Sequence, residues 1–282
     1  MRKMLLLPLL LLVSAQPLYA DTLKKIADAG VIKIAYRTNI PPFSSTDANG
    51  QPVGYAVDLC RRIAAAVKEE LKLTALETRF VPVNLENRFS KLVAGDADIL
   101  CAATTITLSR MKQVDFSLMT FLTGGAVLSK ADTPIQSISD LTGKQVAVIK
   151  DTSAATALSQ YLQANLIDAS VTTVDDIEAA KQKLDDGDVA ALAHDQIVLI
   201  GQVMGAADPK SYAMSPELFS YEPYGLVLRR NDADFRLVVN RALAGLYRSG
   251  QYKQLYERWF GRAGVRPSPI LAAMYQLQAL PE

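Results

Sequence analysis

Signals for strands and helices alternate along most of the chain, and this alternation limits the fold more than any single motif does. Apolar stretches typical of buried strands precede stretches with helical apolar spacing, over 31–36 then 55–71 and over 79–83 then 84–94. The pattern resumes with strands over 145–149, 171–174 and 189–193 and helices over 153–164 and 176–186. Alternation of this kind predicts an α/β protein in which open, mostly parallel sheets are flanked by helices. Two similar units within 282 residues predict two lobes.

The N-terminus has the pattern of a secretory leader. Two basic residues precede an apolar run from Leu5 to Val13, and the small residue Ala20 suits the end of a leader. The run is much shorter than the roughly 20 apolar residues of a membrane-spanning helix, so a leader is favoured over an anchor. We therefore predict a cleaved signal peptide over residues 1–20 and export of the mature protein. Leu18, near the predicted cut, leaves the cleavage site open within a few residues.

The charge balance argues against a nucleic-acid-binding protein. Lys and Arg total 30 and Asp and Glu total 29, and loss of Arg2 and Lys3 with the leader changes these totals to 28 and 29. A protein that attracts nucleic acid by its overall field needs a basic excess, which this chain lacks.

The chain has two cysteines, Cys60 and Cys101, which are too few and too far apart for a zinc ribbon or a Cys-x-x-Cys redox motif. We therefore expect neither a metal nor another cofactor. Cys60 shares a helix face with Ile63 and Val67, and this face would pack on the sheet that contains Cys101. A disulfide can form if the two Cα atoms approach within about 7 Å, but two separate buried thiols are the favoured state.

In the first unit, hydroxyl groups and an arginine follow a buried strand. The strand covers 99–102, Thr104 and Thr105 stand at its end, and Thr107 is placed to cap a short turn that carries Arg110. Open α/β sheets bind ligands at strand ends, and a guanidinium fork matches a carboxylate. The segment is therefore a candidate carboxylate site. The alternative is a capped turn whose arginine forms a surface ion pair.

The second unit has polar residues at the ends of two of its strands. Thr152 and Ser153 begin a helix after the strand that ends at Ile149, so their hydroxyls and backbone N–H groups can meet a carboxylate there. Simple N-capping is the alternative. His194 and Asp195 close a later strand, where Asp195 either binds a ligand or caps the next helix.

Short motifs occur in a fixed order along the chain. They are Gly30-Val-Ile-Lys-Ile-Ala, Pro42-Phe43, Gly50, Gly54-Tyr-Ala-Val-Asp58, Ala94-Gly-Asp-Ala-Asp98, Thr105 with Arg110 before Asp115-Phe-Ser117, Leu141-Thr-Gly-Lys144 and Trp259-Phe-Gly261. In this order they resemble periplasmic receptors that feed polar amino acids to ABC importers, and the glutamate/aspartate-binding branch most closely. The resemblance covers about Thr22 to Arg262. It implies the type II periplasmic-binding-protein fold, in which two sheet-and-helix lobes are joined by a two-crossing hinge.

The same resemblance implies how the chain is divided. A discontinuous first lobe of residues 21–120 and 224–282 is expected, because in the family the end of the chain returns to the first lobe. The second lobe is expected over 125–218, with hinge crossings at 119–125 and 218–223. Residues 264–282 contain three prolines and are expected to form a tail with one short helix on the first lobe.

Eight candidate ligand-binding residues follow from the strand ends and from the resemblance, namely Arg37, Arg88, Ala103, Thr105, Arg110, Thr152, Ser153 and Asp195. The resemblance implies that Arg110 grips the α-carboxylate, with Thr105 and the Ala103 carbonyl nearby, and that Asp195 takes the α-ammonium. Arg37 stands where the family reads the ligand side chain, and Arg88 matches an arginine of the glutamate/aspartate branch. Without the resemblance, Arg37 would be a solvated loop cation and Arg88 an exposed helix cation.

Four positions depart from the family pattern. Ile40 and Leu85 replace an aromatic pair that sandwiches the ligand in lysine- and glutamine-type relatives, and Leu85 and Ala103 replace serines of the acidic branch. Asp151 adds a negative charge where glycine is usual. An acidic ligand is favoured by the arginines, but these departures leave room for another polar amino acid.

The resulting prediction is a monomeric, non-enzymatic periplasmic receptor that captures glutamate or aspartate and delivers it to an inner-membrane ABC permease. One alternative is an enzyme similar to a periplasmic dehydratase of cyclohexadienyl acids such as arogenate. The acid/base pair of such an enzyme would be Asp195 and the chain's single histidine, His194. Another alternative is a sensory subunit that presents its ligand to a receptor kinase.

Overall fold

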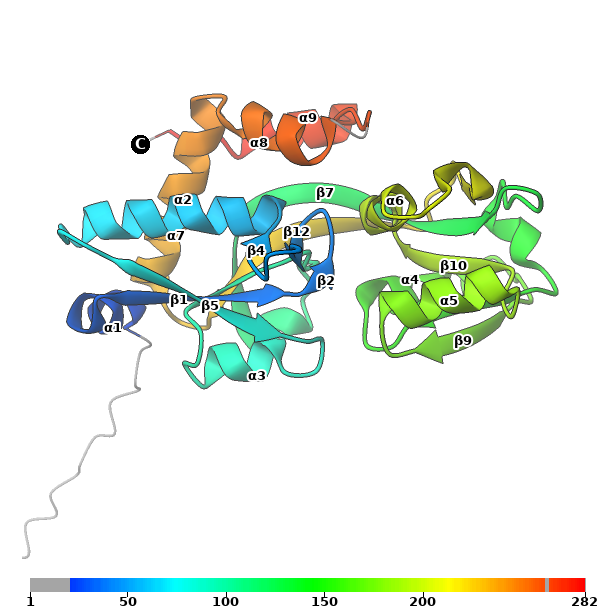
Figure 1. The fold of residues 1–282 in the computed structure, drawn as a ribbon, viewed down its shortest axis with the longest axis horizontal. Coiled ribbons are helices and arrows are strands. Elements are labelled where there is room, and N and C mark those ends of the chain that lie inside the picture. The colour runs from blue at the N-terminus through cyan, green and yellow to red at the C-terminus, as the bar shows by residue number, and fades with distance from the viewer. Residues whose placement is uncertain (1–20, 262–263, 282) are drawn as a thin grey trace, which may run out of the picture.

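A computed structural model describes residues 21–261 and 264–281. The leader predicted for residues 1–20 lies outside the described residues. The chain forms two halves, each with a strand layer and covering helices, and long strands run between them (Figure 1).

The first half is built around β1 (Val31–Arg37), which pairs in parallel with β5 (Glu77–Val83) and β6 (Ile99–Cys101). Its helices are α1 (Thr22–Ala29), α2 (Tyr55–Glu70) and α3 (Arg88–Val93). A small antiparallel sheet follows β1 and consists of β2 (Asn39–Ile40), β3 (Ser44–Thr46) and β4 (Pro52–Val53). Helix α2 buries eight of its 16 residues, so its apolar face supplies much of this core.

The second half repeats the arrangement around β8 (Gln145–Ile149), which pairs in parallel with β9 (Ser170–Val174) and β10 (Ala191–Asp195). Its helices are α4 (Ser153–Ala164), α5 (Ile177–Asp186) and α6 (Gln196–Met204). The short elements η2 (Ile138–Leu141), η3 (Pro209–Ser211) and β11 (Tyr212–Met214) complete it.

Two long antiparallel strands, β7 (Val114–Lys130) and β12 (Ser220–Arg229), join the halves. Strand β12 pairs with β6 of the first half, and the end of β7 pairs with β10 of the second. The result is one nine-stranded mixed sheet in the order β5-β1-β6-β12-β7-β10-β8-β9, with β11 beside β7. These strands are the two expected crossings, while the residue limits of the lobes and the hinge stay a prediction.

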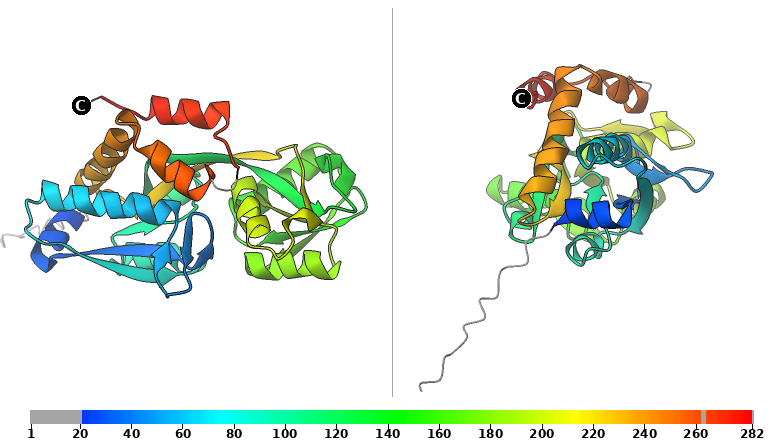
Figure 2. Two further views of the ribbon diagram at one scale, coloured as in Figure 1. Left: turned by 45° about the horizontal axis from the view of Figure 1, so that its top comes forward. Right: turned by 90° about the vertical axis from the view of Figure 1, so that its left-hand side faces the viewer.

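The end of the chain packs back on the first half. Helix α7 (Ala233–Arg248) contacts α2, α8 (Tyr252–Trp259) contacts α2 as well, and α9 (Pro269–Leu277) lies on β7. Figure 2 shows these orange and red helices on the α2 side of the long strands. The tail therefore contains the single short helix that its sequence predicts.

Gly124 and Gly125 lie inside β7 and not in a turn. A Cβ atom at Gly125 would stand 2.3 Å from the Phe219 ring, and one at Gly124 would stand 2.7 Å from the Ser220 carbonyl oxygen. These glycines are needed because the two crossing strands approach each other closely.

An aromatic cluster holds the crossing strands against the first half. Phe43 makes edge-on contacts with Tyr55, Phe121 and Tyr224 at centroid separations of 5.1 to 5.9 Å, and Phe260 packs against Phe121 at 4.9 Å. Since each large ring is almost fully buried, this cluster is a main part of the core.

Cys60 and Cys101 form a disulfide, with a Cα separation of 6.4 Å. The expectation of two separate thiols was wrong. Helix α2 packs directly on β6 and brings the two residues into bonding range, a distance that the spacing of the cysteines in the sequence does not reveal.

The helix expected over 84–94 begins only at Arg88. The side chains of Asn84 and Asn87 each accept a hydrogen bond from the other's backbone N–H, at 2.9 and 3.0 Å, and so close a turn before the helix. Asparagine favours such local bonds over helix continuation, which explains the later start.

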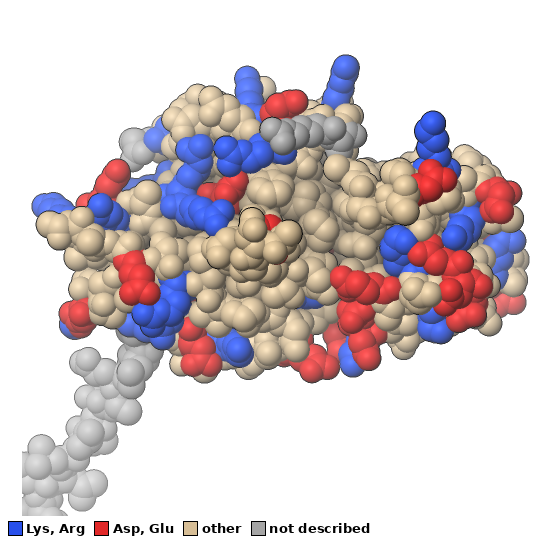
Figure 3. Space-filling view, viewed as in Figure 1, with Lys and Arg blue, Asp and Glu red and all other residues tan. Residues whose placement is uncertain are grey.

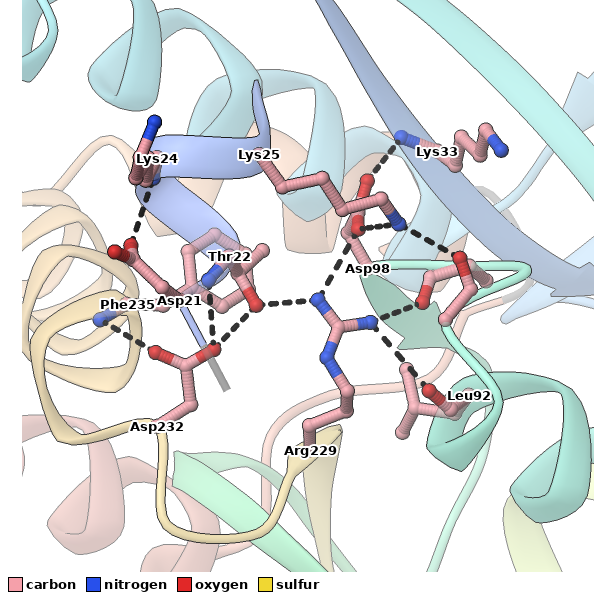
Figure 4. A network of polar contacts seen from close by, with 12 residues as sticks. Asp21, Thr22, Lys24, Lys25, Lys33, Leu92, Asp98, Arg229, Asp232 and Phe235 are labelled. Atoms are coloured by element: carbon pink, nitrogen blue, oxygen red, sulfur yellow. Dashed lines mark hydrogen bonds and ion pairs between the residues drawn. The ribbon is translucent and has the colours of Figure 1, made fainter. Parts of the chain in front are cut away.

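A buried polar network lies at the end of β1 opposite Arg37 (Figure 4). Asp98, 1% exposed, accepts hydrogen bonds from the Lys33 backbone N–H at 2.8 Å, from Lys25 Nζ at 3.0 Å and from Arg229 Nη2 at 3.2 Å. Arg229 also donates to the Thr22 hydroxyl and so ties α1 to β12. The motif that ends at Asp98 therefore stabilises the first half.

In the described part of the chain, no helix is both long and apolar enough to span a bilayer. Basic and acidic side chains both occur on the face shown in Figure 3.

Candidate ligand-binding site

A cavity lies where the two halves face each other, at the carboxyl ends of β1, β6, β8 and β10. It holds about 590 Å³ of space, including solvent at its mouth. All eight candidate residues line it, namely Arg37, Arg88, Ala103, Thr105, Arg110, Thr152, Ser153 and Asp195. The apolar part of its wall consists of Ile40, Leu85, Ala102, Ile149, Ile177 and Val198. The fold thus brings together polar side chains that the sequence distributes over the ends of several strands.

Arg110 begins the short helix η1 (Arg110–Lys112), and the Thr107 hydroxyl accepts its backbone N–H at 3.2 Å, as the capping prediction requires. Its guanidinium donates one hydrogen bond, to the Thr105 carbonyl at 2.7 Å. It forms no ion pair with any described residue, so the surface ion pair of the alternative interpretation is not found. Burial lowers the pKa of Arg110, while Asp195 and Glu222 act in the opposite direction. The remaining N–H donors are available to an anion.

Asp195 is the last residue of β10 and is 5% exposed. Its Oδ2 accepts a hydrogen bond from the Tyr224 hydroxyl, and its Oδ1 has no hydrogen-bond partner. Burial raises the pKa of Asp195 to about 6, against the opposing effects of the Tyr224 hydrogen bond and of Arg110. The side chain does not cap α6, although the residue stands at the N-cap position. Asp195 therefore lines the cavity with a carboxylate that has one oxygen without a hydrogen-bond partner.

Arg37 and Arg88 are buried, at 7% and 6% exposure, so neither is the solvated cation of the alternative interpretations. Arg37 ends β1 and donates from Nη2 to the Asn39 amide oxygen at 3.2 Å. Arg88 donates to the Leu85 carbonyl and stacks over the Phe89 ring at 4.5 Å. Neither guanidinium has a carboxylate within ion-pair distance among the described residues.

The environment of these two guanidinium groups favours an added anion. Burial, together with repulsion from Arg110 and Arg37, lowers the pKa of Arg88 to about 9, and Asp151 acts in the opposite direction. The pKa of Arg37 is also lowered by burial, with partial compensation from Glu178 and Asp176. Buried charges are costly unless paired, so this side of the cavity is suited to an anion.

The two residues at the start of α4 differ in their contacts. Thr152 is an N-cap: its hydroxyl accepts the Ala155 N–H at 3.2 Å and donates to the Ile149 carbonyl at 2.8 Å. Ser153 donates to the Thr105 hydroxyl at 2.9 Å and so joins the second half to the first. The capping interpretation therefore describes Thr152, and Ser153 is a polar group of the cavity.

Asp151 stands at the rim, exposed, with a φ of 59°. This left-handed backbone conformation favours glycine, which explains why the family that this chain resembles usually has a glycine at this position. An aspartate tolerates the same conformation better than most residues, so the departure needs no change in the loop.

Two residues of this region were not foreseen from the sequence. Glu222 is 2% exposed and Tyr224 is 1% exposed, and both lie on the face of β12 that also carries Ser220. The sequence contains one indication of these residues, since Ser220, Glu222 and Tyr224 alternate as side chains on one face of a strand do. This alternation can be recognised only if the predicted strand begins at Ser220.

His194 is buried, and its Nδ1 accepts the backbone N–H of Asp195 at 2.6 Å. Burial lowers the pKa of His194 to about 4, so the imidazole is neutral at pH 7. In the described ranges, no three His, Cys, Asp or Glu side chains are grouped as a metal site requires.

Residues 32–262 match the model of the family described as bacterial extracellular solute-binding proteins, family 3. The chain belongs to this family. Two relatives of this family 3 protein are similar over most of their length. The L-glutamate/L-aspartate-binding protein of Pseudomonas aeruginosa is 33% identical over 249 residues, which are 86% of this chain and 82% of the relative. The glutamate/aspartate import solute-binding protein of Salmonella typhimurium is 31% identical over 244 residues, with shares of 86% and 81%.

Solved structures show that the family 3 protein has the expected two-lobed type II fold. An ancestral arginine-binding protein bound to glutamine has a TM-score of 0.72 and 30% identity over 82% of this chain and 98% of its own. An ancestral amino acid-binding protein described as a precursor of cyclohexadienyl dehydratase has a TM-score of 0.72 and 28% identity over 86% and 100%. The resemblance inferred from the ordered motifs is confirmed, and the family 3 protein is a solute-binding protein and not an enzyme.

Proposed function

We propose that this protein captures an acidic amino acid, glutamate or aspartate, in the periplasm and delivers it to an inner-membrane ABC permease. One observation carries the proposal: Arg37 and Arg88 are buried in the cavity wall with no carboxylate partner among the described residues. A cavity that held a neutral or basic side chain would leave both guanidinium groups without an ion-pair partner, since Glu178, Asp176 and Asp151 act on them only from a distance.

The backbone of the ligand would be bound by Arg110 and Asp195. The free N–H donors of Arg110 suit an α-carboxylate, and the unpaired Oδ1 of Asp195 suits an α-ammonium. The backbone N–H groups at the N-terminal end of α4 would add hydrogen-bond donors to the same carboxylate.

The side-chain carboxylate would lie between Arg37 and Arg88. This anion would relieve the repulsion that lowers the pKa of Arg88. Three or four charge-assisted contacts of about 1.5 to 3 kcal/mol each can supply the roughly 8 kcal/mol of micromolar binding after association costs. The two relatives described above are named for glutamate and aspartate, which supports the same ligand class here.

The cavity is closed by residues of both halves, so binding would hold the halves together. Ser153 reaches Thr105 across the cavity, and outside it Asn39 donates to Glu178 at 2.9 Å. We propose lobes of residues 21–120 with 224–282 and of 125–218, with hinge crossings at 119–125 and 218–223, that close on a single ligand as a monomer.

An enzyme of the cyclohexadienyl dehydratase kind is disfavoured by His194. A general acid or base works best with a pKa near the operating pH, whereas His194 has a pKa of about 4 and receives a backbone N–H at Nδ1.

A thermal-shift screen of the mature protein with the twenty amino acids and with arogenate tests the proposal. A ligand that binds the folded state raises the melting temperature, so L-glutamate and L-aspartate should give the largest shifts. Larger shifts with basic amino acids, or conversion of arogenate to an aromatic product, would overturn it.

A further inference from the structure

Glu222 is a buried acidic residue that the proposed contacts leave unused. It is the third residue of β12, where that strand crosses between the halves, and its side chain is 2% exposed. Its Oε1 accepts a hydrogen bond from the Ser220 hydroxyl at 2.7 Å, and its Oε2 has no partner. A fully buried carboxylate with one free oxygen is unusual enough to require an explanation.

The free oxygen of Glu222 has one counterpart. In the part of the chain that the structure describes, the buried side-chain polar atoms without a hydrogen-bond partner are Asp195 Oδ1 and Glu222 Oε2. Both are carboxylate oxygens, so both can only accept. An ammonium group in the cavity could donate to Asp195, which lines it, while its positive charge would favour the ionised form of Glu222, which does not line it.

The two carboxylates lie in one neighbourhood. Tyr224, two residues after Glu222 on the same strand face, donates to Asp195. The cavity-lining hydroxyls of Thr105 and Ser153 lie beside the Glu222 carboxylate and favour its charged form. Burial raises the pKa of Glu222, and the nearby Asp195 charge raises it further. A cation bound between them would favour both charges.

Glu222 would also influence the orientation of the Thr105 hydroxyl group. The Thr105 hydroxyl already accepts a hydrogen bond from Ser153, so its own proton is free to turn toward the Glu222 carboxylate. The second lone pair of Thr105 would then face the cavity as an acceptor. The negative charge of Glu222 and this oriented hydroxyl act in the same direction, because both favour a cationic group at that wall.

We propose that Glu222 is a positioning residue of the ammonium subsite, where it acts through Thr105 and adds a second negative charge to that of Asp195. The proposal rests on the proposed function, since it assumes an amino-acid ligand. It predicts that much of the preference for a ligand with an α-ammonium comes from a residue outside the cavity wall.

The test compares L-glutamate with glutarate, which keeps both carboxylates and lacks the ammonium. Kd values for each are measured by calorimetry at pH 7.5 for the wild type, for Glu222→Gln and for the control Glu217→Gln. Glu217 is half-buried in the second half and bonds Tyr161 and the Ile138 N–H, away from the cavity. Glu222→Gln should lower the preference for glutamate over glutarate at least tenfold, and Glu217→Gln should leave it unchanged.

If Glu222 had only a structural role, Glu222→Gln would weaken the binding of L-glutamate and of glutarate by the same factor. An unchanged preference for glutamate would therefore overturn the proposal while the proposed function stands. If the wild type binds no amino acid, the proposed function fails and this proposal fails with it. Should Glu222→Gln not fold, Asp195→Asn replaces it in the test. That variant should still prefer glutamate over glutarate, whereas complete loss of the preference would assign the whole subsite to Asp195 and contradict a role for Glu222.

Discussion

The hydroxyl of Tyr224 donates a hydrogen bond to Oδ2 of Asp195 and so joins the aromatic core of the first half to the cavity wall of the second. The ring of Tyr224 packs 5.2 Å from that of Phe43, so the hydroxyl is held by the core. This bond occupies one oxygen of the carboxylate, and the other has no hydrogen-bond partner among the described residues.

Tyr224→Phe removes the hydroxyl and keeps the ring in the aromatic cluster. Since the hydroxyl lowers the pKa of Asp195, its loss should raise that pKa and weaken amino-acid binding about tenfold at pH 7, about 1.4 kcal/mol. Calorimetry with L-glutamate measures the change, and thermal unfolding checks the core. An affinity equal to that of the wild type would show that Asp195 does not depend on Tyr224.

Arg110→Ala should abolish binding of every amino acid, because the α-carboxylate common to all of them would lose its main partner. The fold should remain, since Arg110 makes one side-chain hydrogen bond and no ion pair with the described residues. The matched control is Arg236→Ala, which removes an ion pair with Asp115 on the first half outside the cavity. Unchanged affinity in Arg110→Ala would reduce Arg110 to a turn residue.

Binding should weaken as the pH falls through about 6. Burial raises the pKa of Asp195 to about 6, and only the ionised carboxylate can pair with the ligand's ammonium. Below that pH the affinity should fall by up to tenfold per pH unit, and near pH 6 binding should release protons. Calorimetry in buffers of different ionisation enthalpy counts these protons, and an affinity independent of pH between 7 and 5 would contradict the role of Asp195.

The unliganded protein should show the opposite trend. Because the folded-state pKa of Asp195 exceeds its usual value of 3.8, this residue contributes stability that is complete below about pH 4 and is lost as the pH rises through about 6. Asp195→Asn should therefore raise the melting temperature of the unliganded protein at pH 7 and change it little at pH 4. Glu222 titrates in the same neighbourhood, so the observed midpoint belongs to the pair.

Ligand should bring the two halves together, since its ammonium would be bound from β10 and its carboxylates chiefly from the first half. Solution scattering with and without saturating L-glutamate should show a smaller radius of gyration in the bound state. Equal radii with proven binding would rule out closure of a clamp.

Much of the site was predictable because its residues stand at strand ends. Arg37 ends β1 and Thr105 follows β6, while Ser153 follows β8 and Asp195 ends β10. Within each half these strands are parallel, so their carboxyl ends lie at one edge, and the edges of the two halves both border the cavity. Apolar periodicity located these strands within a few residues, so the chemistry at their ends could be listed without a structure.

Other features depend on contacts between distant segments. The burial of Arg37 and Arg88 cannot be read from a charged residue in a loop or a helix, because it depends on how the folded chain forms the cavity that both residues line. Glu222 was missed because β12 begins at Ser220, in a polar stretch paired with β7, and apolar periodicity starts the strand only at Tyr224. The Cys60–Cys101 bond likewise depends on how closely α2 lies on β6.

The central claim is that Arg37 and Arg88 bind a side-chain carboxylate, and the calorimetric ratio of L-glutamine to L-glutamate affinity tests it most directly. The two ligands have nearly the same shape and differ in the charge at that position. The wild type should bind glutamate at least 100-fold more tightly, about 2.8 kcal/mol, and Arg37→Asp should remove this preference while Arg110 and Asp195 still hold the ligand backbone. A wild-type protein that binds glutamine, lysine or arginine as tightly as glutamate would contradict the claim.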